Sequence, residues 1–107
     1  MTAETSKTMR DILAAVVESG TGKLAQSKFF KFAGKTGTGQ KIDPNGTFSH
    51  TKFTASFIGF APVEDPQIAI AVIVDEPRPY YYGGVVSAPA FKLVAEDVLK
   101  YRQANEN

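Results

Sequence analysis

Apolar residues recur at helical spacing near both ends of the chain. The first set lies at i, i+3, i+4, i+7 and i+8 and forms one stripe: Met9, Ile12, Leu13, Val16 and Val17. Thr2 is a candidate N-cap and Gly20 suits the residue after a helix end. The pattern predicts a helix over residues 3–19.

The second apolar stripe lies near the C-terminus. Its members are Phe91, Val94, Ala95, Val98 and Leu99. Ser87 is a candidate N-cap, and Pro89 would then fall in the first turn. Backbone amides of the first turn have no partner within the helix, so the missing N–H of proline costs no hydrogen bond there. These features predict a helix over about 88–103.

The middle of the chain has the composition of strands. Residues 29–38 begin with three phenylalanines, Asp43-Pro44-Asn45-Gly46 is a strong turn sequence, and a second strand should follow over about 51–60. Residues 67–74 are apolar at successive positions, which is typical of a central strand covered on both faces.

These elements predict an α+β fold, in which an antiparallel sheet of about three strands has the N- and C-terminal helices on one face. The second face then has no cover from the chain itself. We therefore expect either a fragment with a missing partner segment or self-association, with homodimerisation as the competing explanation.

Composition narrows the function only slightly. The chain has 107 residues and a net charge of +1, which fits one small domain and names no partner. It has no cysteine, so disulfides and thiolate metal sites are excluded. The longest apolar stretch, 68–74, is far shorter than the ~20 residues that span a bilayer.

Residues 32–40, Phe-Ala-Gly-Lys-Thr-Gly-Thr-Gly-Gln, carry the most suggestive chemistry. Glycines leave the backbone open to close approach, Lys35 adds positive charge, and Thr36 and Thr38 add hydroxyl donors. This combination suits an anionic group bound next to a carbonyl.

Other motifs are weaker. Gly34-Lys35-Thr36 lacks the first glycine and the following helix of a phosphate-binding loop. Five lysines between residues 23 and 41, interleaved with phenylalanines, leave open a basic nucleic-acid surface, although overall neutrality favours a solvated face. Ser49-x-x-Lys52 is expected on a strand, where the two side chains point to opposite faces, and His50 has no metal-ligand partners at a matching spacing.

Ala33 to Gln40 resembles the Lys-Thr-Gly motif of penicillin-binding protein transpeptidases. The surrounding sequence is also similar to that family over roughly residues 2–102. The similar segments are 9–13 and 17–22 before the motif, then 54–62, 72–77 and 82–91. Asp75-Glu76-Pro77 and Tyr82-Gly83-Gly84 resemble the class B enzymes of septal wall synthesis. The resemblance implies a partial penicillin-binding/β-lactamase-like fold.

The resemblance implies D,D-transpeptidase chemistry for the intact protein, acting on peptidoglycan stem peptides, inhibited by β-lactams and needing no cofactor or metal. The Thr36 and Thr38 hydroxyls would bind the substrate carboxylate, and Lys35 would supply positive charge near it. The Thr38 amide would be one oxyanion donor, and Gly37 would let the substrate lie along the strand. The setting would be the extracytoplasmic face of the bacterial inner membrane, through an anchor elsewhere.

The family's serine nucleophile and its Ser-x-Asn motif have no counterpart in these residues. We therefore expect 1–107 to be the C-terminal portion of a transpeptidase domain, paired with an upstream part and inactive alone. The alternatives are a non-catalytic interaction module of transpeptidase ancestry and a basic-surface nucleic-acid binder, although nucleic acid is not the expected partner.

Overall fold

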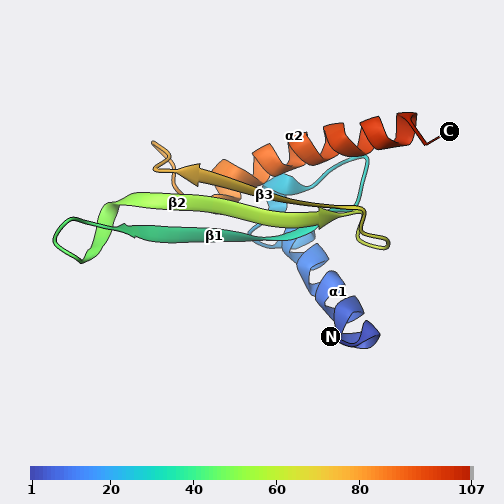
Figure 1. Ribbon diagram of the computed structural model, residues 1–107, viewed down its shortest axis with the longest axis horizontal. Helices are drawn as coiled ribbons and strands as arrows, with labels where there is room; N and C mark the ends of the chain where they lie inside the picture. Colours follow the sequence, from blue (N-terminus) through green and yellow to red (C-terminus); the bar gives the residue numbers. More distant parts are fainter. Residues whose placement is uncertain (107) are drawn as a thin grey trace.

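The computed structural model describes residues 1–106, in which two α-helices and a 3₁₀ helix accompany three strands. In chain order the elements are α1 (Ala3–Ser19), η1 (Lys23–Ala25), β1 (Ala33–Ile42), β2 (Phe48–Ala61), β3 (Ile68–Asp75) and α2 (Gly83–Ala104). All strand pairings are antiparallel (Figure 1). The predicted α+β class and the two-helix, three-strand content are confirmed.

The sheet has the order β1-β2-β3, so β2 is its central strand. Thr36 of β1 and Val72 of β3 both lie opposite Phe57 of β2. The β1–β2 hairpin reaches well beyond the end of β3 (Figure 1). Its turn is the predicted one: the Gly46 amide donates to the Asp43 carbonyl at 2.9 Å, and Gly46 has φ of 86°, a conformation that glycine adopts without strain.

The prediction that residues 67–74 form a central strand is wrong for the part of the chain described. β3 lies at an edge of the sheet, and its residues alternate between half-buried and exposed. Ile70 and Val72 pack against the core, whereas Ile73 is 65% exposed. From Ile68 to Val74 the strand has only alanine and β-branched residues, and the one polar residue on its open face is Asp75 at the end, so the interior of the strand gave no sign of an open face.

The core lies between the sheet and α2. Phe57 of β2 and Phe91 of α2 are fully buried, with ring centroids 4.7 Å apart, and Phe32 meets Phe91 edge-on at 5.5 Å. A Cβ on Gly59 would come within 2.6 Å of the Phe91 ring, so the helix sits directly on the sheet. Burial of a phenylalanine contributes about 1.5–3 kcal/mol, so this aromatic cluster fixes α2 on the sheet.

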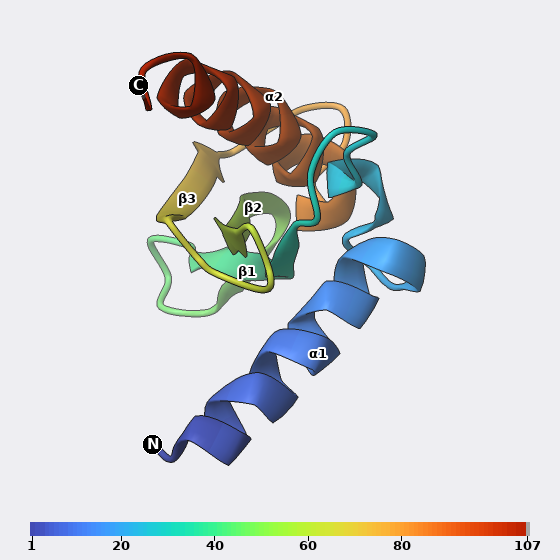
Figure 2. The ribbon, with the colours of Figure 1, turned by 90° about the vertical axis from the view of Figure 1, so that its right-hand side faces the viewer.

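The two helices lie on opposite sides of the sheet, which corrects the expectation of a shared face (Figures 1 and 2). Among the strands α1 contacts only β1. Its first half borders a small apolar hollow with Phe60 and Pro66, and Phe60 points away from the face on which Gly59 meets α2. An apolar stripe shows which side of a helix is buried, but not which sheet face receives it.

Some element boundaries also differ from the predictions. α1 agrees, and the Thr2 hydroxyl caps it by accepting from the Thr5 amide at 3.0 Å. α2 begins at Gly83 rather than at 88, so Pro89 lies inside the helix. Ser87 is not a cap, because its buried hydroxyl donates to the Ala55 carbonyl at 2.9 Å. β1 begins at Ala33 rather than at 29, after the phenylalanine run.

Candidate functional site

The residues predicted to bind an anion lie on β1 at the second edge of the sheet. Two other segments meet this edge, the loop after α1 and the N-terminus of α2. Together they surround a cavity of about 370 Å³. It is lined by Thr21, Lys23, Leu24, Thr36, Thr38, Tyr82, Gly83, Gly84 and Val85. The site therefore combines three elements that are far apart in sequence.

Thr36 and Thr38 point to the same face of β1, because side chains two residues apart on a strand share a face. Both hydroxyls meet an incoming element. The Gly83 amide, in the first turn of α2, donates to Thr38 Oγ at 3.0 Å, and Thr36 Oγ lies 3.1 Å from Thr21 Oγ. The structure thus brings the two predicted hydroxyls into one cavity.

The N-terminus of α2 adds an electrostatic contribution. The helix is 22 residues long, and its first turn contains no acidic residue and no side-chain cap. A helix N-terminus carries a partial positive charge and free amide donors, which favour anions. The cavity beside Thr36 and Thr38 is therefore suited to a negatively charged group.

Lys35 leaves β1 on the opposite face and is exposed. Its ammonium nevertheless returns to the edge of the strand, where Nζ donates to the Thr36 carbonyl at 3.2 Å and to Thr36 Oγ at 3.4 Å. The positive charge of Lys35 thus lies next to the hydroxyl pair.

The outer edge of β1 offers backbone groups as well. Because Lys35 reaches the Thr36 carbonyl, this carbonyl points away from β2. In an antiparallel pair the direction of the backbone groups alternates from residue to residue, so the Thr38 amide shares this open edge. Gly37 is half-buried, and a Cβ there would come within 2.6 Å of Ser56 Oγ.

An aromatic stack borders the cavity on the α2 side. The Tyr81 ring stacks on Phe53 of β2 with centroids 4.0 Å apart, and Tyr82 tilts against Tyr81 at 4.5 Å. The Tyr81 hydroxyl donates to that of Tyr82 at 3.3 Å, and this bond raises the pKa of Tyr81 above its usual value. Tyr81 therefore packs the loop before α2 onto the hairpin.

The Ser49-x-x-Lys52 sequence lies on β2, so its position on a strand agrees with the prediction. Ser49 is buried, and its Oγ accepts from the Thr51 and Lys52 amides at 3.1 and 2.9 Å. It stabilises a local backbone irregularity and is closed to a substrate. His50 is exposed beside it.

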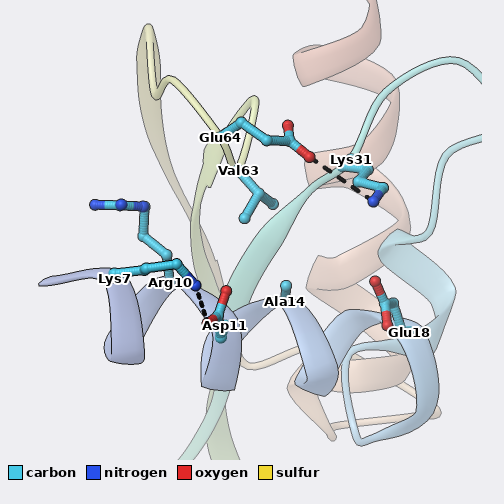
Figure 3. Close-up of a pocket in the computed structure, with 8 residues that line it drawn as sticks. All are labelled: Lys7, Arg10, Asp11, Ala14, Glu18, Lys31, Val63 and Glu64. Carbon is cyan, nitrogen blue, oxygen red and sulfur yellow. Dashed lines mark hydrogen bonds and ion pairs between the residues drawn. The ribbon is translucent and has the colours of Figure 1, made fainter. Parts of the chain in front are cut away.

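A second hollow, of about 420 Å³, lies between α1 and the loop after β2 (Figure 3). Its charges largely pair with one another: Lys7 with Asp11 at 3.0 Å and Lys31 with Glu64 at 3.7 Å. Arg10 points away from the hollow in this view. Because four of its six charged side chains pair with one another, this hollow is a weaker candidate for a ligand site than the β1 cavity.

The sequence singled out Lys35, Thr36, Gly37 and Thr38 as candidates, and the structure adds Thr21 and Gly83 as neighbours of the two threonine hydroxyls. Thr21 and Gly83 both lie outside the helices and strands that the sequence predicts. They reach the hydroxyl pair from 15 and 45 residues away along the sequence. No local pattern links such positions, and only the packing of α2 against β1 brings them together.

Comparison with known proteins identifies the family. Residues 1–96 match the penicillin binding protein transpeptidase domain. The chain belongs to this family. The Probable peptidoglycan D,D-transpeptidase PenA of Neisseria gonorrhoeae is 41% identical over 92 residues, covering 84% of this chain and 16% of PenA. Stage V sporulation protein D of Bacillus subtilis is 41% identical over 97 residues, which cover 90% of this chain and 15% of that protein.

Solved structures agree with the sequence relatives. The transpeptidase domain of Burkholderia pseudomallei penicillin-binding protein 3 superposes with a TM-score of 0.81 at 37% identity, covering 92% of this chain and 30% of that one. Penicillin binding protein 3 of Mycobacterium tuberculosis, in complex with ampicillin, superposes with a TM-score of 0.86 at 31% identity. The match covers 96% of this chain and 25% of that one. The chain is part of a class B transpeptidase domain. It spans about a sixth to a quarter of the length of the curated relatives that it matches. Neither α1 nor α2, within residues 1–106, is long and apolar enough to cross a membrane.

Proposed function

We propose that this chain is the C-terminal portion of a peptidoglycan D,D-transpeptidase domain, in which β1 binds the carboxylate of a stem peptide or β-lactam. One observation carries the proposal: the Thr36 and Thr38 hydroxyls, the Lys35 ammonium and the N-terminus of α2 meet at the open edge of β1. Each contributes a donor or positive charge, and no acidic residue lines the cavity.

In this proposal the ligand lies along β1 as an added strand, because the outer backbone groups of β1 have no strand partner within residues 1–106. Thr36, Thr38 and Lys35 bind the carboxylate. The Thr38 amide stabilises the oxyanion that forms when a serine attacks the carbonyl carbon, an interaction worth about 3 kcal/mol. Gly37 leaves the strand surface free of a side chain.

The serine comes from the upstream part of the same domain. Complexes of the Mycobacterium tuberculosis protein with ampicillin and aztreonam support β-lactams as ligands of the whole domain. The names of the relatives, a peptidoglycan D,D-transpeptidase and a sporulation protein, support peptidoglycan cross-linking as the process, and we place it in cell division. We place the parent protein at the extracytoplasmic face of the inner membrane, held by an anchor outside these residues.

The carboxylate role is tested in a fusion of this chain to the remainder of the Burkholderia pseudomallei domain, replacing the matched segment. We expect benzylpenicillin to acylate the fusion faster than its methyl ester, which lacks the charge. Thr36→Val with Thr38→Val should remove this preference, because a hydrogen bond to a charged group contributes about 1.5–3 kcal/mol. Equal rates for acid and ester in the unmodified fusion would contradict the proposal.

The chain alone should form no penicilloyl adduct. Its one Ser-x-x-Lys sequence lies on β2 with a buried serine, so it offers no activated nucleophile. Intact-mass spectrometry after incubation with benzylpenicillin checks this, with the acylated fusion as the positive control. A stoichiometric adduct on the 107-residue chain would show that the nucleophile is present after all.

A further inference from the structure

A third hydroxyl belongs to the group around the cavity. Thr21 lies in the loop after α1, and its Oγ is 3.1 Å from Thr36 Oγ. We propose that Thr21 is a positioning residue, which frees the Thr36 hydroxyl proton for an anionic ligand. This inference rests on the proposed carboxylate role of β1 and adds a residue to it.

The donors around Thr36 Oγ determine where its own proton can point. A hydroxyl has one proton to donate and two lone pairs to accept with. The Lys35 ammonium has only donors, so its contact with Thr36 Oγ at 3.4 Å uses one lone pair. If Thr21 donates to the second lone pair, the Thr36 proton has only the cavity left to point into.

The Thr38 hydroxyl has a similar arrangement of donors. Its Oγ accepts from the Gly83 amide at 3.0 Å, which leaves its proton free. With Thr21 as the donor to Thr36, both β1 hydroxyls present protons to the same cavity. Two aligned donors favour a carboxylate, which only accepts, over a neutral ester.

The backbone holds Thr21 in place for this role. The amides on either side of it, Gly20 and Gly22, both donate to the Val16 carbonyl at the end of α1, each at 3.0 Å. On the other side, a Cβ on Gly84 would collide with the Thr21 carbonyl oxygen. Thr21 is therefore clamped between the end of α1 and the start of α2, and is aimed at β1.

The first test uses the 107-residue chain without any ligand. Three-bond couplings to the methyl carbon of Thr36 report its χ1 rotamer. We expect one rotamer in the wild type and in Thr21→Ser, and averaging over rotamers in Thr21→Val, which keeps the side-chain shape but removes the hydroxyl. Thr8→Val, the same change on α1, is the control. An unchanged Thr36 rotamer in Thr21→Val would overturn the inference.

The second test uses the fusion protein and the ratio of acylation rates for benzylpenicillin and its methyl ester. Thr21→Val should lower this ratio about three- to tenfold through weaker binding of the acid, and Thr21→Ser should restore it. A structural defect would slow acid and ester alike. A preference for the acid that survives Thr21→Val refutes the role of Thr21 alone, whereas a wild type without any preference refutes the proposed function.

Discussion

The residue at position 83 determines how closely α2 approaches β1. A Cβ on Gly83 would collide with the Ser56 carbonyl oxygen and come within 2.7 Å of that of Gly37. Both obstacles are backbone atoms of the paired strands, which a rotamer change cannot relieve. The hydrogen bond from the Gly83 amide to Thr38 therefore depends on the absence of a side chain at this position.

Gly83→Ala should therefore push the start of α2 away from the sheet. We expect a loss of stability of about 1–3 kcal/mol, the usual cost of overpacking, and a large change in the chemical shift of the Gly83 amide position. Gly39→Ala on β1 is the matched control, because a Cβ there has no neighbour within 4 Å. Urea unfolding measures both variants. Equal stability of the two would mean that the contact is not tight in solution.

At the scale of elements, one lysine side chain links β1 to the end of β3 across β2. Lys41 Nζ lies 2.9 Å from Asp75 and 3.1 Å from Glu76, so it bridges from β1 across β2 to β3. Glu76 has φ of 51°, uncommon for a residue other than glycine. Its amide donates to the Phe53 carbonyl at 2.8 Å. The ion pairs and this bond hold the strained turn together.

This bridge gives stability a definite dependence on pH. Hydrogen bonds to Asp75 and then Glu76 raise the pKa of Lys41 above its usual value. A raised pKa for a cation means that its contribution is complete below about pH 10, the ordinary lysine range, and is lost as pH rises through the folded-state value. Lys41→Met should thus lower the melting temperature near neutral pH.

The difference between wild type and Lys41→Met should shrink as the pH is raised above the lysine range. Thermal unfolding followed by circular dichroism at several alkaline pH values measures it. Lys28→Met, which removes an exposed lysine outside the described ion pairs, is the control. A difference that stays constant through the alkaline range would show that Lys41 acts through its aliphatic stem and not through its charge.

The elements that the sequence predicted well are those with a local cause. The helical stripe and Thr2 cap predicted α1, and Asp43-Pro44-Asn45-Gly46 predicted the hairpin turn. The start of α2 was misplaced because two glycines usually mark a loop, whereas here their lack of side chains lets the helix begin against β1. The face chosen by α1 and the edge position of β3 depend on tertiary packing, which leaves no local trace.

The candidate site also contains residues that the sequence pointed to and residues that only the fold brings together. Lys35, Thr36 and Thr38 are consecutive or nearly so, and their chemistry was evident from composition alone. Their geometry was not evident, because Lys35 and the threonines leave β1 on opposite faces and are joined only by the return of the lysine ammonium to the strand edge. Thr21 and Gly83 arrive from other elements and had no sequence signature.

At the scale of the whole molecule, one face of the sheet is only partly covered. α1 contacts β1 alone among the strands, whereas Ile58 of β2 and Ile73 of β3 are 59% and 65% exposed. They share the face away from α2, because Ile73 lies opposite Ser56, two residues from Ile58. The adjacent edge of β3 also has no strand partner within residues 1–106.

Self-association through this face therefore remains our prediction for the isolated chain, since an apolar face beside an open strand edge favours pairing between copies. Sedimentation velocity at increasing concentration should show a shift toward dimers or larger species. Ile73→Lys should reduce it, because a charge on the open face opposes burial. Leu93→Lys is the matched control, since Leu93 is 63% exposed but lies on α2.

If both variants reduce association equally, the outer surface of α2 contributes as much as the sheet. If the wild type stays monomeric at all concentrations, the incomplete sheet is tolerated in water, and the upstream part of the domain is needed for catalysis and not to keep this portion soluble.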